Sequence, residues 1–295
     1  MLIRRLSVFA VMCIAWCAAG GAVQADLMVR GFDANLHNRF ANHPDFIGIS
    51  HDWSGVGRNS QWATMISDSF FLSATHSHPG NGTNVTFFHS NDPAGASESH
   101  AVAEGWGIGT SDLWLGRLAT SVSTSVAKYA IADVSPAAAE SLDFLTFGLA
   151  SGFAPAARQR VGRNEVDLVL PAFSDPALAG AGDVFIYDYD LTGGVGDDEA
   201  RVAGGDSGAP TFFLSDSGPA ILGIHWFLYT EDDLDGGSGS GDTFVPSYID
   251  ALNARMAPFG ESLTIVSVPE PSSVVLYGLA LGFVIIRHRR RVHLN

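Results

Sequence analysis

Short apolar runs separated by polar turns occupy the central part of the chain. Four clear examples are residues 46–49, 62–66, 70–74 and 221–226, and glycine, serine, asparagine and aspartate are frequent between the runs. Apolar runs of this length at short spacing are typical of β-strands in a sandwich or a barrel. The pattern therefore predicts an all-β domain over residues 46–266.

Helical periodicity is convincing in one segment of that domain, residues 247–256. The apolar side chains there recur at helical spacing and would share one face: Tyr248, Ile249, Leu252 and Met256. We expect a C-terminal helix that packs on the strands. Residues 135–140 are expected to connect two halves of the domain, with the boundary near Pro136.

Composition limits the partners and the means of stabilisation. The 295 residues carry a formal charge of −15, and such an acidic surface repels the phosphates of nucleic acids. Nucleic acid is therefore excluded as a partner. Both cysteines, Cys13 and Cys17, lie in the first 17 residues, so no disulfide can cross-link the rest of the chain. We predict no cofactor.

The N-terminal residues differ from the domain that follows them. A basic start precedes an apolar run that ends in Val-Gln-Ala at residues 23–25, where the small residues fit a signal-peptidase site. We expect residues 1–25 to be a signal peptide, so that the mature chain starts near Asp26 and is exported. Residues 26–45 are polar and are expected to form an extended N-terminal arm.

The C-terminal residues 267–295 combine three features in order. A Pro-Glu-Pro motif at 269–271 precedes an apolar run at 272–286, and a basic cluster at 287–291 follows. A helix of that length spans about 22 Å, and snorkelling arginines would make up part of the difference from a hydrocarbon core of about 30 Å.

This order of features resembles the PEP-CTERM sorting signals of Gram-negative bacteria. The resemblance implies transient contact with the inner membrane through residues 272–286 and recognition by exosortase-type sorting machinery. It also implies delivery to the cell surface or the extracellular matrix.

Candidate chemistry centres on Ser207, which follows Gly205-Asp206 and precedes Gly208. Glycines let the backbone turn sharply and approach a ligand closely. Two backbone N–H groups can then converge on one point, as an oxyanion hole requires. The alternative is an ordinary Gly/Ser-rich surface turn between two strands.

A base and an orienting acid are available at two strand ends. His76 follows the apolar run 70–74, and Asp112 directly precedes an alternating run. A buried carboxylate needs a hydrogen-bond partner, and a histidine N–H is a suitable one. The alternatives are an exposed loop histidine, a turn aspartate, or a metal site at His76 and His78. Because the sequence singles out no third ligand, we predict no metal.

The order His76, Asp112, Ser207, with its flanking strands and closing helix, resembles the chymotrypsin-type (trypsin-like) serine proteases. The resemblance covers most of residues 46–256. It implies two six-stranded antiparallel β-barrels, with the site in the cleft between them and the connection near Pro136.

The resemblance also implies a role for each residue. Ser207 would be the nucleophile, His76 the general base, and Asp112 the residue that orients the imidazole. The backbone N–H groups of Gly205 and Ser207 would form the oxyanion hole.

The Gly-Ile-His-Trp sequence at 223–226 is similar to that of glutamyl endopeptidases. This similarity implies that His225 and Trp226 would line the substrate channel. His225, with Arg201 six residues before Ser207, would then favour a glutamate or aspartate before the scissile bond. The alternative is that His225 is a histidine packed on a buried strand.

Two features remain open at this point. No Ile-Val-Gly-Gly activation site is visible, so the sequence does not identify a partner for Asp206. The acidic loops 188–199 and 232–242 have oxygen ligands suited to Ca²⁺, and solvated acidic loops are the commoner alternative.

The resulting hypothesis is an exported, surface-sorted serine endopeptidase whose substrate is a protein or peptide. One rival is a catalytically inactive protease-like domain that serves as a surface adhesion or matrix protein. A second rival is a metal-binding β-protein that uses His76 and His78.

Overall fold

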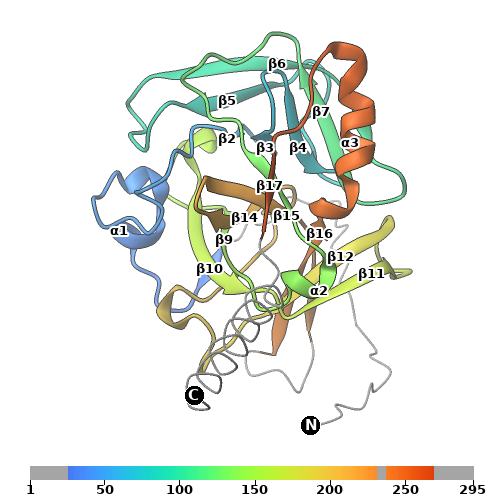
Figure 1. The fold of residues 1–295 in the computed structure, drawn as a ribbon. Coiled ribbons are helices and arrows are strands. Elements are labelled where there is room, and N and C mark those ends of the chain that lie inside the picture. The colour runs from blue at the N-terminus through green and yellow to red at the C-terminus, as the bar shows by residue number, and fades with distance from the viewer. Residues whose placement is uncertain (1–25, 231–236, 269–295) are drawn as a thin grey trace, which may run out of the picture.

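The computed structural model describes residues 26–230 and 237–268 (Figure 1). It consists of a closed six-stranded barrel and a curled nine-stranded sheet, so the prediction of an all-β double barrel is confirmed. Within the described residues, no helix is long and apolar enough to span a membrane. The predicted signal peptide at 1–25 and the apolar run 272–286 lie outside the described residues.

Six strands form the closed barrel, which lies at the top of Figure 1. Their spatial order is β2-β3-β4-β7-β6-β5, and every neighbouring pair is antiparallel. Their bounds are Val56–Arg58 (β2), Trp62–Met65 (β3), Phe70–Ala74 (β4), Asn84–Phe88 (β5), Ser97–Gly107 (β6) and Leu113–Leu118 (β7). Gly116 leaves room for the ring of Phe71, because a Cβ there would lie 2.1 Å from that ring.

The second sheet lies below this barrel, with seven strands in the order β10-β9-β14-β15-β16-β12-β11. Two further strands join it in parallel, since β8 pairs with β15 and β17 pairs with β8. The bounds are Ala130–Asp133 (β8), Asp143–Gly148 (β9), Arg160–Glu165 (β10), Leu168–Ser174 (β11), Ala181–Asp188 (β12), Pro210–Ser215 (β14), Gly218–Thr230 (β15), Ser238–Phe244 (β16) and Ile265–Ser267 (β17). Because β8 precedes Pro136, the second sheet begins before the predicted connection, which contains the short helix α2 (Pro136–Ala139).

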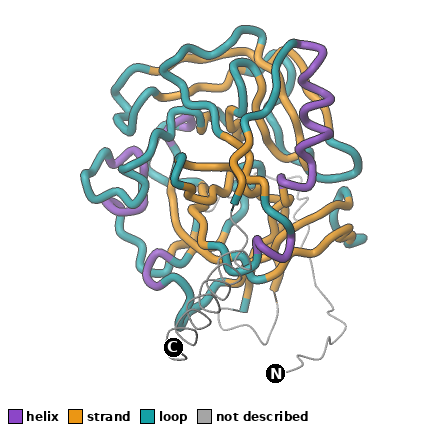
Figure 2. The backbone as a smooth tube through the Cα atoms, viewed as in Figure 1, coloured by secondary structure: helices purple, strands orange, loops and turns teal. Residues whose placement is uncertain are grey.

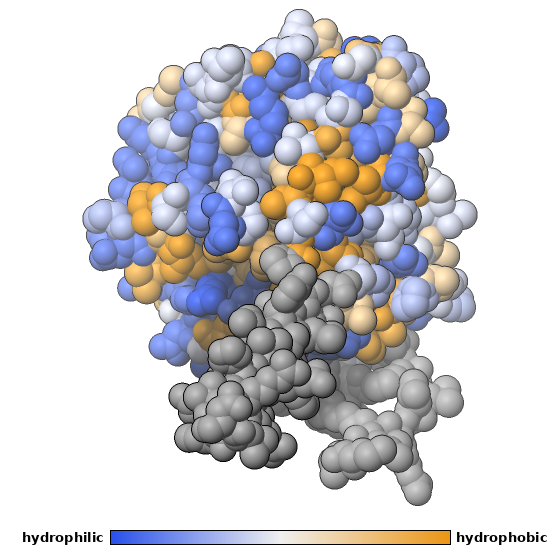
Figure 3. Space-filling view, in the orientation of Figure 1, coloured by the Kyte–Doolittle hydropathy of each residue, from blue (hydrophilic) through white to orange (hydrophobic). Residues whose placement is uncertain are grey.

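Helical structure is sparse, as Figure 2 shows. The predicted C-terminal helix is confirmed as α3 (Ile249–Met256), with Leu252 and Met256 buried. Outside the N-terminal arm, the other helical turns are η2 (Pro155–Ala157), η3 (Gly196–Asp198), η4 (Val245–Tyr248) and η5 (Ala257–Phe259). Phe259, at the end of η5, and Ile265, at the start of β17, are each 43% exposed. Hydrophobic surface is also visible on the face drawn in Figure 3.

The N-terminal arm, residues 26–45, is folded and packed. Its elements are β1 (Met28–Val29), α1 (Ala34–His37) and η1 (Arg39–Ala41). Strand β1 pairs with β13 (Ala200–Arg201), and Leu27, Arg39 and Phe40 are buried. The expectation of an extended polar arm is wrong, because these side chains gain more from burial and hydrogen bonding than the arm loses in conformational freedom.

Arg39 joins the arm to the closed barrel and to Gln159, the residue directly before β10. Its side chain is fully buried, and its guanidinium donates hydrogen bonds of 2.8–3.3 Å to Asn91 Oδ1, Gln159 Oε1 and the carbonyl oxygens of Val56, Phe88 and Ser90. Burial lowers the pKa of Arg39 to about 10. The group is therefore still a cation at neutral pH, and oxygens of the protein replace its hydration.

Replacement of Arg39 by methionine tests this joining role. The variant leaves several buried acceptors without a donor, so we expect Arg39→Met to lower the free energy of unfolding by about 3–5 kcal/mol. Urea denaturation measures the change. Lys128→Met is the control, because that ammonium lies 3.3 Å from the exposed carboxyl of Asp68 and such pairs contribute about 0–1 kcal/mol. Equal losses in the two variants would contradict the role of Arg39.

Candidate active site

Two neighbouring strands of the closed barrel bring His76 and Asp112 together. Strands β4 and β7 are antiparallel, and Ala74 lies opposite Leu113. His76 comes two residues after β4 ends, and Asp112 comes one residue before β7 begins. Both side chains therefore lie at the same end of the strand pair.

His76 and Asp112 form a close pair. His76 Nδ1 is 2.6 Å from Asp112 Oδ2, and the backbone N–H of His76 donates to Asp112 Oδ1 at 3.0 Å. The carboxylate accepts from Nδ1–H, so Nε2 is the ring nitrogen that can take up a proton. The side chain of His76 is 32% exposed and that of Asp112 is 1% exposed, so the ring is accessible while its orienting partner is not.

The environment of Asp112 favours a hydrogen-bonded carboxyl. Burial raises the pKa of Asp112 above its usual value, and the hydrogen bond and positive charge of His76 oppose that shift. The pair is consequently coupled, because a positive charge on the imidazole stabilises the carboxylate. A base that must gain a proton during a reaction benefits from such a partner.

The turn that carries Ser207 lies against the turn that carries His76. Gly208 has a φ of 85°, and a Cβ on it would lie 2.7 Å from Ser73 Oγ and 3.0 Å from the carbonyl oxygen of Ser77. Glycine is thus required for both the backbone conformation and the close contact. The two turns come from different sheets, so this contact brings the three predicted catalytic residues to one junction.

The backbone around Ser207 leaves two donors available. Gly205 has a φ of 106°, and Asp206 N–H donates to the carbonyl oxygen of Ala203 at 3.1 Å in a tight turn. Among the described residues, the N–H groups of Gly205 and Ser207 have no protein acceptor. No described protein acceptor therefore competes for these two N–H groups, which is a condition that an oxyanion hole must meet.

Asp206 is bound by backbone groups. Its buried carboxyl accepts the N–H of Leu149 at Oδ1 and that of Ala203 at Oδ2, each at 2.7 Å. Burial raises the pKa of Asp206 to about 7, and these two hydrogen bonds oppose the shift. The structure thus supplies partners for Asp206 that the sequence did not identify.

His225 is enclosed in the second sheet and is 1% exposed. Nδ1 lies 2.8 Å from Asp242 Oδ1, and Nε2 lies 2.8 Å from the carbonyl oxygen of Phe147 and 3.0 Å from Thr146 Oγ1. Burial is the largest single influence on the pKa of His225 and lowers it. The charge and hydrogen bond of Asp242, the charge of Asp206 and the hydrogen bond to Phe147 together outweigh burial, so the net shift is upward. No ring nitrogen is free for an acidic substrate side chain, so the predicted direct contact through His225 does not fit. The alternative of a packed strand histidine does.

Arg201 is a partly buried cation at the end of β13, six residues before Ser207. Its Nε is buried without a hydrogen-bond partner, and its guanidinium lies 5.7 Å from the ring centre of Tyr189. Burial lowers the pKa of Arg201, and Tyr189 opposes the shift. Among the described residues, no carboxylate lies within salt-bridge distance of Arg201.

Trp226, the third predicted substrate-binding residue, lies at a bulge in β15 between His225 and Phe227. Its ring is 6% exposed and packs edge-on against Phe173 of β11 at 6.1 Å. Phe227 stacks on the same Phe173 ring at 5.0 Å. The hairpin β11–β12 therefore covers this part of β15.

A stacked ring pair that the sequence did not suggest lies next to the His76–Asp112 pair. His78 lies parallel to Trp114, with 3.6 Å between ring centres and 7° between planes. The two residues come two positions after His76 and two after Asp112. The stack therefore joins the turn that carries His76 to β7, the strand that follows Asp112. The spacing of aromatic residues around the two catalytic candidates is the signal that could have suggested it.

A metal site has little support in the described residues. His76 binds Asp112, His78 stacks on Trp114, and the described residues contain no group of three His, Cys, Asp or Glu side chains placed to hold a metal ion. This finding includes loop 188–199. Residues 231–236 of the second acidic loop lie outside the described part of the chain.

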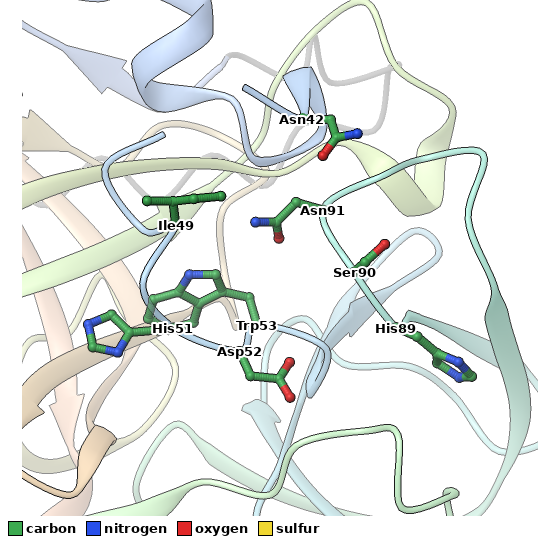
Figure 4. Close-up of a pocket in the computed structure, with 8 residues that line it drawn as sticks. All are labelled: Asn42, Ile49, His51, Asp52, Trp53, His89, Ser90 and Asn91. Atoms are coloured by element: carbon green, nitrogen blue, oxygen red, sulfur yellow. The ribbon is translucent and has the colours of Figure 1, made fainter. Parts of the chain in front are cut away.

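A cavity of about 320 Å³ lies between the arm, the segment before β2 and the loop after β5 (Figure 4). His51 and Asp52 line it from one side, and Ser90 and Asn91 line it from the other. It includes none of the three candidate catalytic residues and is separate from the site.

Comparisons with known proteins assign no family to this site. No protein-family model and no curated protein matches the chain. The functional conclusion therefore depends on the geometry described above.

The raised pKa of Asp206 predicts how the free energy of unfolding changes with pH. Its folded-state pKa of about 7 exceeds the value of about 3.9 expected in the unfolded chain. Between these values the folded state holds more protons, so this group's contribution to stability falls as pH rises from about 4 to about 7. We measure the free energy of unfolding of both wild type and Asp206→Asn by urea denaturation from pH 5 to pH 8. We expect the value for the wild type to fall relative to that for Asp206→Asn as the pH rises. A difference that is constant over this range would contradict the shifted pKa.

Proposed function

We propose that the chain is a serine endopeptidase that acts on protein or peptide substrates through His76, Asp112 and Ser207. The observation that carries the proposal is the buried Asp112 carboxyl bonded to His76 Nδ1 at 2.6 Å, next to a glycine-flanked serine turn. This arrangement leaves one imidazole nitrogen available to a nucleophile, which is what acyl transfer requires.

The proposed reaction begins with acylation of Ser207. Ser207 Oγ attacks the carbonyl carbon of the scissile peptide bond while His76 Nε2 takes the hydroxyl proton. The N–H groups of Gly205 and Ser207 donate to the oxyanion of the tetrahedral intermediate. The C–N bond then breaks, His76 returns its proton to the leaving amine, and an acyl-enzyme remains.

Deacylation repeats the sequence with water as the nucleophile. His76 takes a proton from the water, whose oxygen attacks the ester carbon, and the bond to Ser207 Oγ breaks as the serine regains a proton. Asp112 holds the imidazole orientation and stabilises the imidazolium in both steps.

The proposed location is outside the cytoplasm. The signal-peptide pattern in residues 1–25 and the resemblance of residues 267–295 to a PEP-CTERM signal support export, followed by exosortase-type sorting to the cell surface or matrix. Residues 272–286 would contact the inner membrane during this process.

We also propose that the peptidase prefers an acidic residue before the scissile bond and that Arg201 provides the positive charge. Its Nε is buried without a partner, and no described carboxylate neutralises it. Because a partly buried charge without a partner is costly, a substrate carboxylate would be stabilised there. His225 would affect this preference only indirectly, because it helps to pack β15 against β16.

A serine-directed fluorophosphonate probe tests the peptidase proposal. We expect the wild type to be labelled and Ser207→Ala to be unlabelled, because the probe reacts with the activated hydroxyl. Asp112→Asn should label about 10⁴-fold more slowly, because it disturbs the tautomer of His76. Absence of labelling in the folded wild type would instead favour the inactive adhesion or matrix protein.

Cleavage of a peptide library tests the acidic preference. We expect glutamate and aspartate to be enriched immediately before the cuts. Arg201→Gln should lower kcat/KM for a glutamate peptide about 10–100-fold. This factor corresponds to the free energy of one hydrogen bond to a charged group. The matched glutamine peptide is the control and should change little. Equal effects on both peptides would contradict a charge-recognition role for Arg201.

A further inference from the structure

One residue connects the Ser207 turn to the N-terminal arm. The N–H of Leu149 donates to Asp206 Oδ1 at 2.7 Å, and its carbonyl oxygen accepts the N–H of Leu27 at 3.0 Å. Leu27, Leu149 and Asp206 are all fully buried. A shift of the arm at Leu27 is therefore transmitted to the residue that precedes Ser207.

The arm also contacts the segment on the other side of Asp206. Strand β1 pairs with β13, so that Val29 lies opposite Ala200 and Met28 opposite Arg201. The same segment continues to Ala203, whose N–H donates to Asp206 Oδ2 at 2.7 Å. The arm thus borders both backbone segments that hold the Asp206 carboxyl.

Arg160, on β10, binds the arm at several points. Its guanidinium donates to the carbonyl oxygen of Leu27 at 2.8 Å, to Asp26 Oδ2 at 3.0 Å and to Asn38 Oδ1 at 3.1 Å. The ring of Phe32 covers the guanidinium at 3.8 Å. Because the planar guanidinium donates in several fixed directions, no single-point cation can replace all of these contacts.

We propose that residues 26–29 position the Ser207 turn and that Arg160 is the positioning residue that keeps them in place. The inference rests on the proposed peptidase function. When the arm moves, Leu149 loses a donor to its carbonyl oxygen and the Asp206 carboxyl gains freedom. The N–H groups of Gly205 and Ser207 then lose their alignment with the oxyanion, and small misalignments reduce rates strongly.

The test compares Arg160→Lys with Arg163→Lys in the full chain. Both residues are on β10, but Arg163 pairs with the exposed carboxyl of Asp143 at 3.2 Å. Two quantities are measured below the melting transition of each variant: the fluorophosphonate labelling rate and the deuterium exchange of peptides covering residues 146–150 and 203–209. We expect Arg160→Lys to slow labelling about tenfold or more and to accelerate exchange in both peptides. Arg163→Lys should match the wild type in both measurements.

The outcomes separate this inference from the function on which it rests. Failure of the wild type to react overturns the peptidase proposal itself. A reactive wild type with an equally reactive Arg160→Lys variant overturns the positioning role, as does slower labelling without faster exchange in the two peptides. If Arg160→Lys does not fold, Asp26→Asn removes one carboxylate contact of Arg160 and is expected to produce a smaller change in the same direction. No change in that folded variant would also refute the inference.

Discussion

The hydrogen bonds of Arg39 link the closed barrel to Gln159, the residue directly before β10 of the second sheet, and the candidate site depends on how the two sheets are placed. His76 and Asp112 belong to the closed barrel, whereas Ser207 follows β13 beside the second sheet. A cation with no exposed surface is tolerated when its donors meet acceptors. The oxygens of Val56 and Gln159 meet this requirement together only if the sheets are correctly placed. The enclosed charge therefore restricts the relative placement of the residues that form the site.

The same use of buried polar groups recurs within the second sheet. His225 pairs with Asp242, which also accepts a hydrogen bond from Thr211 Oγ1 at 2.6 Å, and Asp206 binds two backbone N–H groups. Such networks strongly favour one arrangement, because a displaced member leaves a buried polar atom unsatisfied. The polar interior thus helps to fix β14, β15 and the Ser207 turn.

Local spacing was sufficient to predict the strands and helix α3, since each depends on a few neighbouring residues. His76 and Asp112 lie 36 positions apart, and they were proposed as a pair because each lies at a strand end and because their order resembles that of a known family. The contact between His225 and Asp242 was not predictable, because it depends on the register of β15 against β16. The folding of the arm was missed for a similar reason. Arg39 finds Gln159 across 120 positions of sequence, and no short pattern encodes that contact. The sequence therefore named the groups at the site more readily than their surroundings.

The stack of His78 on Trp114 affects how the spacing of His76 and Asp112 responds to reducing or oxidising conditions. The only cysteines of the chain are Cys13 and Cys17, so thiol–disulfide exchange has no bond to act on in residues 26–230 and 237–268. An aromatic contact, which involves no redox-active bond, joins the turn that carries His76 to the strand that follows Asp112. The spacing of His76 and Asp112 is accordingly independent of the redox poise of the surroundings, and reducing agents should leave it intact.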